Sequence, residues 1–515
     1  MSPTTTEKID VAAVPAGRTW RLLSAVERWG NRLPHPFFLF LYIAVAIIAL
    51  SAVARFAGWS AVSPSTGESV QVRSLLSGEG AEFMVTSAID NFVGFPPLGL
   101  IVTVMLGIGV AQRSGLLERA MRSAVMAAPP GLVTFAVVLV SMMGNLASDS
   151  AMVILPPLAA AAFMAAGRHP IAGFVASYSA VAAGFSANLL PAGTDVLLAG
   201  ITTEATSIVQ DMAISPVANW YFMGASTLVL AVVITFACQR FVEPRLGPYT
   251  GTALADAATL EPASPSERRA LLATCLALVL FAVVVAAAVL YPASPLRGEG
   301  GAILRSPFMS SLPVCILLGF LLAGVTYGKA AGTITHKSDV PAMMAESVKE
   351  LAPFLVVIFS AAQAIAYFDW TQLGLLVATE GAAIMEATNL DGIWGLALFA
   401  VFVFVPALLM VSGSGLWTLL APIFVPMFMI NSIDPAYVQA AFRISDSATN
   451  PLVPMNPMLP VVLGFMQQYD RKAGLGTLFS LVLPFTVTIW LVWMALFVLW
   501  GLLGLPVGPG HGLTF

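Results

Sequence analysis

Two charged residues, Arg443 and Asp446, lie inside a long apolar stretch of the sequence. If this stretch crosses a bilayer, each charge costs at least about 2.5–3.5 kcal/mol, so both residues are expected to serve a function. Three residues apart, they would share one helical face and could pair. The guanidinium of Arg443 suits a carboxylate, and Asp446 would balance Arg443 when no anion is present or carry a coupling proton. The alternative is an ion pair that serves packing alone.

The residues after Asp446 predict that this helix is broken. Pro451, Pro454 and Pro457 each remove a backbone donor and prevent a regular helix. The surrounding stretch is also polar, with Ser445, Ser447, Thr449, Asn450 and Asn456. An ion pair needed only for packing would not require so long a polar break, so the pattern favours a functional site.

A second predicted break ends at Asp195. Pro191 and Gly193 interrupt an apolar stretch there. The freed carbonyl groups, together with Asn188, Thr194 and Asp195, could hold a small cation, because hard cations prefer oxygen ligands. Asp195 could instead carry a proton. The alternative is an ordinary helix cap at a kink.

Two further polar segments interrupt apolar stretches, at residues 144–151 and 411–417. Asp149 in the first would line a cavity or cap its own helix ends. In the second, glycines let the backbone approach a ligand closely, and the hydroxyl of Ser414 offers a neutral hydrogen bond. Trp417 offers an aromatic face, or it belongs to the belt of aromatic residues at the membrane interface.

The composition predicts that a membrane positions these residues. The chain has 515 residues, of which 58% are hydrophobic and 10% charged, whereas a soluble protein carries about 25% charged residues. We expect an all-α polytopic membrane protein with about nine spans of about 20 residues. The predicted spans are 37–58, 96–112, 170–200, 219–240, 269–291, 307–327, 351–368, 436–466 and 475–503. Two interrupted stretches, 131–166 and 393–430, fit neither one span nor two, and we predict two opposed re-entrant hairpins.

The distribution of basic residues supports this count. With the N-terminal segment 1–36 in the cytoplasm, the 23 Lys and Arg residues divide into eighteen on the cytoplasmic side and four on the other. Only Arg443 then remains in the membrane. This agrees with the positive-inside rule, and making either hairpin a single span would spoil the division.

A weak internal repeat suggests how the chain is organised. Residues 151–200 align with 416–465 at an offset of 265, with nine identities in fifty positions. We predict an inverted-topology repeat, although convergence of Pro- and Gly-rich membrane helices is the alternative. The predicted parts are a first half at 37–246, a polar cytoplasmic linker at 247–268, a second half at 269–503, and an unstructured tail at 504–515.

These motifs resemble the AbgT family of p-aminobenzoyl-glutamate transporters over nearly the whole chain. The shared motifs are Gly-Asn-x-x-Ser-Asp-Ser, Asn-x-x-Pro-Ala-Gly-Thr-Asp, Val-Ser-Gly-Ser-x-x-Trp and Arg-x-x-Asp-Ser-x-Thr-Asn-Pro. The resemblance implies a homodimer in the bacterial inner membrane. It also implies ion-coupled transport of p-aminobenzoyl-glutamate, a folate breakdown product, and efflux of sulfonamides, with coupling to H⁺ or Na⁺.

The family's functional positions match Asp195, Ser414, Trp417, Pro435, Arg443, Asp446 and Pro454. For ion coupling we select Asp149, Asn188, Asp195, Asp446 and Asn450, of which Asn188, Asp195 and Asn450 would hold sodium. The glutamate carboxylates of the substrate suit Arg443, and its aminobenzoyl ring could stack on Trp417.

Other classes of protein fit the sequence less well. An intramembrane enzyme is disfavoured, because no His stands near the acidic residues in the sequence and no metal-binding motif is present. The phosphate-binding loop of an ATP-driven pump is missing, and no basic run suggests nucleic acid. No cofactor other than the coupling ion is expected. A transporter of another organic anion, such as a dicarboxylate, and a channel remain as alternatives.

Overall fold

The computed structural model describes residues 34–62, 67–147, 150–249, 264–298, 301–303, 306–390, 392–454, 456 and 458–515. Most of the predicted cytoplasmic segment 1–36 and of the linker 247–268 lies outside these residues, as does Asp149. The described chain is helical apart from one small antiparallel pair, β1 (Ser60–Val62) with β2 (Ser69–Gln71). The predicted all-α class is confirmed.

The elements of the first half follow in chain order. They are α2 (Pro36–Phe56), α3 (Gly78–Thr86), α4 (Ala88–Val93), α5 (Pro96–Arg113), α6 (Leu116–Met126), η1 (Pro130–Leu132), α7 (Val133–Met143), η2 (Gly144–Ala147), α8 (Ser150–Ala165), α9 (Pro170–Ala183), α10 (Gly193–Thr206), α11 (Trp220–Ala237), the π-helix η3 (Cys238–Val242) and α12 (Glu243–Leu246).

The second half begins with a helix that is capped at Ser264 and starts with a proline, which costs no intrahelical bond at this position. Its elements are α13 (Pro265–Leu290), α14 (Pro307–Ser310), α15 (Leu312–Ala331), α16 (Asp339–Glu350), α17 (Ala352–Trp370), α18 (Leu373–Ala387), α19 (Ile393–Leu409), α20 (Gly413–Ile430), α21 (Pro435–Thr449), η5 (Asn450–Leu452), α22 (Leu459–Tyr469) and α23 (Leu475–Leu502).

Eight helices in the described chain are long and apolar enough to cross a membrane. Seven of them coincide with predicted spans, and the eighth is α20, the second arm of the second predicted hairpin. The other two predicted spans are each divided by a break, into α9 and α10 and into α21 and α22. Helix α18 was not predicted, because its stretch is short and carries Glu380 and Glu386.

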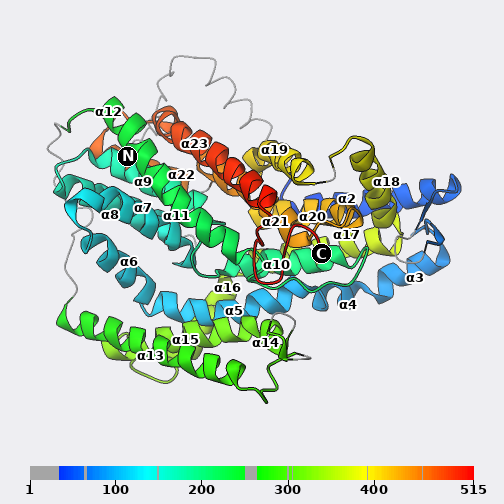
Figure 1. Cartoon of the computed structure of the whole chain (residues 1–515), viewed down its shortest axis with the longest axis horizontal. Coiled ribbons are helices and arrows are strands. Elements are labelled where there is room, and N and C mark those ends of the chain that lie inside the picture. The colour runs from blue at the N-terminus through cyan, green and yellow to red at the C-terminus, as the bar shows by residue number, and fades with distance from the viewer. Residues whose placement is uncertain are drawn as a thin grey trace, which may run out of the picture.

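The helix contacts form two groups, and α13, α15 and α5 of the first group lie along the lower side of Figure 1. In one group α5 packs against α15 and α16, α13 against α15, and α2 against α17. In the other, α7 and α8 pack against α9, and α19 and α20 against α21. Contacts of α5 with α10 and of α18 with α20 join the two groups. Asp195 on α10 therefore lies close to the boundary between them.

The element boundaries repeat at the offset seen in the sequence. Pro170 and Pro435 each begin a helix, and both helices end just before a break of similar length. The packing repeats as well, because α10 contacts α20 and its counterpart α22 contacts α8. Each half thus places its second broken segment on the hairpin of the other half, as in a pseudo-two-fold arrangement.

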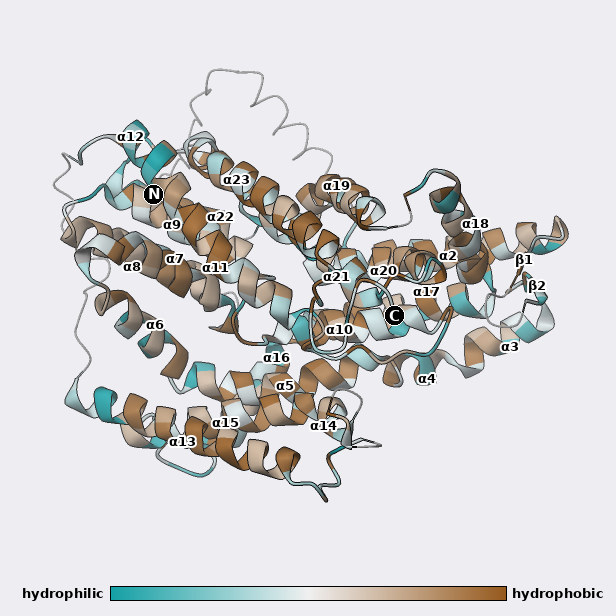
Figure 2. Cartoon of the chain, viewed as in Figure 1, coloured by the Kyte–Doolittle hydropathy of each residue, from teal (hydrophilic) through white to brown (hydrophobic). Residues whose placement is uncertain are grey.

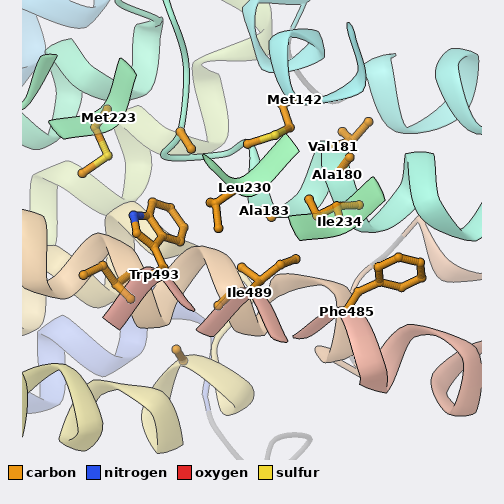
Figure 3. Packing of buried hydrophobic residues seen from close by; sticks show 14 of the residues in the cluster. Met142, Ala180, Val181, Ala183, Met223, Leu230, Ile234, Phe485, Ile489 and Trp493 are labelled. Carbon is orange, nitrogen blue, oxygen red and sulfur yellow. The ribbon is translucent and has the colours of Figure 1, made fainter. Parts of the chain in front are cut away.

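Helix α11 holds the second group together (Figure 3). Its residues Leu230 and Ile234 lie between Val181 of α9 and Ile489 of α23, and all four are buried. Trp493 of α23 is also fully buried and donates a hydrogen bond from Nε1 to Ser226 Oγ at 2.9 Å. These contacts place α9, α11 and α23 in one close-packed apolar core.

The outer helices carry apolar side chains on their exposed faces (Figure 2). In α13, Leu272 and Leu276 are each 71% exposed, and few residues of this helix are buried. A soluble protein rarely exposes so continuous an apolar surface. The surface agrees with a chain that crosses a membrane many times.

The C-terminal tail is ordered, so the prediction for residues 504–515 was wrong. Val507 is fully buried and accepts a backbone hydrogen bond from Phe222 at 3.0 Å. Leu513 accepts one from Asp434, also at 3.0 Å, and the tail ends at the letter C in Figure 1. Its Gly- and Pro-rich composition suggested disorder, but hydrogen bonds to distant segments order it.

Candidate functional site

Helix α21 carries both charges of the predicted centre and is buried at every residue. Its start is held by the side chain of Asp434, which accepts a hydrogen bond from the Ala436 amide at 2.8 Å. Midway along the helix, the Ser445 hydroxyl donates to the carbonyl of Ala400 and accepts from Trp490 Nε1 at 2.9 Å. Neighbouring helices on two sides therefore fix the direction in which α21 points its charges.

Arg443 forms an ion pair with Asp195, from Nη1 to Oδ1 at 2.5 Å. The two residues are 248 positions apart and come from opposite repeat halves. Their side chains are 1% and 12% exposed, so the pair is almost completely desolvated. Removing one partner of such a pair leaves a buried charge uncompensated, which costs about 3–5 kcal/mol.

Asp195 also caps the start of α10. Its Oδ2 accepts a hydrogen bond from the Ala192 amide at 2.6 Å. The carboxylate therefore serves both as helix cap and as partner of Arg443. The guanidinium can donate a further hydrogen bond, because its Nε is buried without a hydrogen-bond partner among the described residues.

Asp446 does not pair with Arg443, in contrast to the expectation from their spacing. Its carboxylate lies against Gly413 at the start of α20, where a Cβ on Gly413 would approach Oδ2 to 2.5 Å and Oδ1 to 2.8 Å. Asp446 is 1% exposed, and Oδ2 has no hydrogen-bond partner in the described part of the chain. The pairing prediction failed because Asp195, which is distant in sequence, reaches Arg443 instead.

Trp417 is fully buried, so its ring is covered in this conformation. The ring packs against Phe442 with centroids 4.6 Å apart, and Nε1 donates to Thr202 Oγ1 at 3.0 Å. The Thr202 hydroxyl in turn donates to Gln439 Oε1 at 2.8 Å. These hydrogen bonds link α20, α10 and α21. A substrate that stacks on the Trp417 ring would therefore require α20 and α21 to separate.

A small pocket lies on the other side of Asp195. Its volume is about 10 Å³, which is room for about one water molecule. The residues that line it are Asn188, Leu190, Pro191, Asp195, Pro216, Trp220 and Met223. The Oδ1 atom of Asn188 is buried and has no partner among the described residues. An unpartnered amide oxygen and a carboxylate in one pocket suit a small cation.

Asn450 does not line this pocket. Its Nδ2 donates to the carbonyl of Ala182 at the end of α9, at 3.4 Å. Tyr178 of α9 donates to the carbonyl of Pro451 at the same distance. The second break therefore rests on the end of α9, and Pro454 lies half-buried in the turn that follows.

Ser414 lies half-buried in the first turn of α20, with Oγ 3.2 Å from Ser412 Oγ. Ser412 caps the helix by accepting from the Gly415 amide at 3.1 Å. The structure thus places Asp446 and Ser414 together at the start of α20. Asp149, the predicted counterpart in the first hairpin, lies outside the described residues.

Sequence reasoning missed three residues of this region: Thr202, Gln439 and Phe442. Gln439 could have been selected from the sequence as a site residue, because it is a polar residue one turn before Arg443 on the same helix. Thr202 carried none, since its importance depends on contacts with Gln439 and Trp417 of the other repeat half.

A many-helix apolar body with broken helices, buried charges at the breaks and a small pocket beside them is the architecture of a membrane transporter. A family model described as the AbgT putative transporter family matches residues 21–515. The chain belongs to this family, and it is a multi-pass membrane transporter rather than an enzyme.

The chain is also similar to individual members. It is 39% identical over 508 residues to the p-aminobenzoyl-glutamate transport protein of Escherichia coli (strain K12), covering 98% of this chain and 99% of that protein. The crystal structure of the Alcanivorax borkumensis YdaH transporter matches with a TM-score of 0.87 and 37% identity over 92% of this chain and all of that one. Neisseria gonorrhoeae MtrF, described within a class of antimetabolite efflux pumps, matches with a TM-score of 0.91 and 37% identity over 95% of this chain and all of its own.

Proposed function

We propose that this chain is an ion-coupled secondary transporter of p-aminobenzoyl-glutamate and related aminobenzoyl and sulfonamide compounds. It would serve uptake of the folate breakdown product, efflux of antimetabolite drugs, or both, with the direction set by the gradients. The observation that carries the proposal is Arg443, a buried arginine with a spare donor whose internal partner comes from the opposite repeat half. Similarity to the Escherichia coli transporter supports the substrate class.

The substrate would lie between α20 and α21. A carboxylate of the glutamyl group would bind the guanidinium of Arg443 in two parallel hydrogen bonds, with Asp195, Ser414, Asp446 and Pro454 completing the site. The aminobenzoyl ring would stack on Trp417 once that ring leaves Phe442. Sulfonamides have the aniline ring without the dicarboxylate, so they would depend chiefly on the aromatic contact.

The coupling ion would bind beside Asp195. The carboxylate and the unpartnered Oδ1 of Asn188 offer two oxygen ligands in one pocket of suitable size. Sodium would take these oxygens, whereas a proton would bind a carboxylate, with Asp446 and Asp149 as further candidates. Asn450 would act on the break itself, because its amide holds the end of α9.

The alternative function is transport of another organic anion, such as a dicarboxylate. The same arginine would bind a carboxylate of such a substrate. We further propose a homodimer in the bacterial inner membrane with a cytoplasmic N-terminus. The positive-inside charge distribution supports this orientation, and the exposed apolar faces of the outer helices support contact with lipid or a second copy.

The test is transport by the purified protein in proteoliposomes. Labelled p-aminobenzoyl-glutamate is offered under sodium or proton gradients imposed in each direction. We expect accumulation against the substrate gradient with one ion, competition by a sulfonamide, and little competition by simple dicarboxylates. Strong competition by dicarboxylates without any transport of the aminobenzoyl compound would favour the alternative.

A further inference from the structure

The start of α20 is an electropositive site within the membrane body. Helix α20 has 18 residues, and the first amide groups of a helix have no intrahelical acceptor. The Ser412 hydroxyl takes the amide of Gly415. The earlier amides of this turn, together with the positive end of the helix dipole, favour an anion.

An internal carboxylate already occupies this place. Both oxygens of Asp446 lie within 2.8 Å of the position that a Cβ on Gly413 would take. Asp446 is 1% exposed, and its Oδ2 has no hydrogen-bond partner in the described part of the chain. A buried carboxylate with one unpartnered oxygen against a helix start is an imperfectly satisfied charge, so another anion with better geometry could replace it.

The same situation recurs at Arg443, one turn away on α21. There the anion-binding group is the guanidinium, and the internal carboxylate is Asp195. Arg443 and Asp446, three residues apart on α21, thus mark two neighbouring groups that attract anions, the guanidinium and the start of α20, and each of these groups faces an internal carboxylate. A glutamyl group carries two carboxylates on one short carbon chain, one for each of these groups.

We propose that Arg443 and the start of α20 at Gly413–Gly415 are two subsites for the two carboxylates of one glutamyl dicarboxylate, and that Asp195 and Asp446 fill them in the substrate-free chain. The proposal rests on the proposed function and assigns the parts of the substrate within that site. It makes Gly413 a specificity-determining residue, because any larger side chain would fill the second subsite.

The exchange also explains why transport would need a cation. A substrate carboxylate that replaces Asp195 or Asp446 leaves a free carboxylate in a buried site, where an unpaired charge is costly. Each displaced carboxylate must then bind a proton or a sodium ion. For Asp195, the pocket that contains Asn188 Oδ1 lies directly beside it.

The first test compares two ligands on purified full-length protein by calorimetry. One is p-aminobenzoyl-glutamate, and the other is p-aminobenzoyl-glutamine, which replaces the γ-carboxylate with an amide of the same shape. We expect the wild type to prefer the glutamate compound by about tenfold. Gly413→Ala should remove this preference and retain binding of the glutamine compound, whereas Gly464→Ala, on α22 with open space around it, should keep the preference.

The second test measures anion binding at the start of α20 without the substrate. It also decides whether this subsite exists if Gly413→Ala does not fold. Asp446→Ala empties the start of α20, so formate should raise its melting temperature in detergent and leave that of the wild type unchanged. An unaltered glutamate preference in Gly413→Ala, or equal formate responses in Asp446→Ala and wild type, would overturn the two-subsite proposal. Failure of the wild type to bind either aminobenzoyl compound would instead count against the proposed function, while the formate response still decides the subsite.

Discussion

The two broken helices of the molecule have the same backbone plan and carry their chemistry in different places. His169 caps α9 by accepting from the amide two residues ahead, and Asp434 caps α21 in the same way. The positions of Arg443 and Asp446 are held in the first half by Tyr178 and Val181. The shared plan is therefore structural, whereas Arg443 and Asp446 belong to the second half alone.

The location of the acids relative to each break explains their different partners. Asp195 lies just after its break, at the start of α10, where a free backbone amide satisfies one oxygen. Asp446 lies before its break, inside a continuous helix whose amides are already used. The charges of Asp446 and Arg443 can therefore be balanced only by groups outside α21. The second broken helix thus depends on the first half and on α20 for its charge balance.

The largest expected effect comes from breaking the pair that joins the two halves. Arg443→Ala should abolish uptake of p-aminobenzoyl-glutamate in proteoliposomes and lower stability by about 3–5 kcal/mol, because Asp195 loses its partner. The double variant Arg443→Ala/Asp195→Ala should recover much of the melting temperature without recovering uptake. Full uptake by the single variant would remove Arg443 from the site.

Asp446→Asn tests the acid whose Oδ2 has no hydrogen-bond partner in the described part of the chain. The amide has nearly the same shape, so packing against Gly413 should survive. We expect gradient-driven uptake to fall by at least about tenfold and to lose its pH dependence. Asp446 would prove purely structural if both the rate and the pH profile matched the wild type.

Two asparagines, one near each break, sharpen the comparison. Asn188 shares a pocket with Asp195, whereas the amide of Asn450 binds a backbone carbonyl outside that pocket. If sodium is the coupling ion, Asn188→Ala should raise its half-saturating concentration about tenfold, and Asn450→Ala, the matched control, should change it less. Equal shifts in both variants would contradict the placement of sodium beside Asp195.

A smaller effect is expected for the hydrogen-bond chain between α20, α10 and α21. Trp417→Phe removes the bond to Thr202 and should lower the free energy of unfolding by about 1 kcal/mol. Thr202→Val removes the same bond together with the one to Gln439. A double-mutant cycle on melting temperatures should therefore show coupling, and strictly additive effects would mean that the bond contributes nothing.

The smallest effect is expected for the C-terminal tail, residues 504–515, which is hydrogen-bonded to the starts of α11 and α21. His511 Nδ1 lies 3.1 Å from both oxygens of Asp434. His511→Ala removes one hydrogen bond to Asp434 and should cost about 1 kcal/mol, because Asp434 keeps its bond to the amide of Ala436. A melting temperature that falls as far as that of Arg443→Ala would contradict this order, because the tail would then matter as much as the central pair.

Much of the framework could be predicted from local sequence signals. Pro191 and Gly193 marked the first break, and Pro451 with Pro454 marked the second, because these residues disturb a helix wherever they occur. Seven spans were recognisable from apolar length alone. Helix α18 was missed because a short helix with two glutamates resembles a loop.

The sequence by itself determined where the spans lie, where they break and which buried charges have to be compensated. These properties depend on each residue and its near neighbours, together with the cost of burying charge. Only the tertiary structure decided that Arg443 pairs with Asp195, that Asp446 faces Gly413, and that Gly- and Pro-rich residues 504–515 are ordered. Those contacts join segments far apart in the chain, and the packing of the two repeat halves, which local patterns do not specify, sets the distances between them.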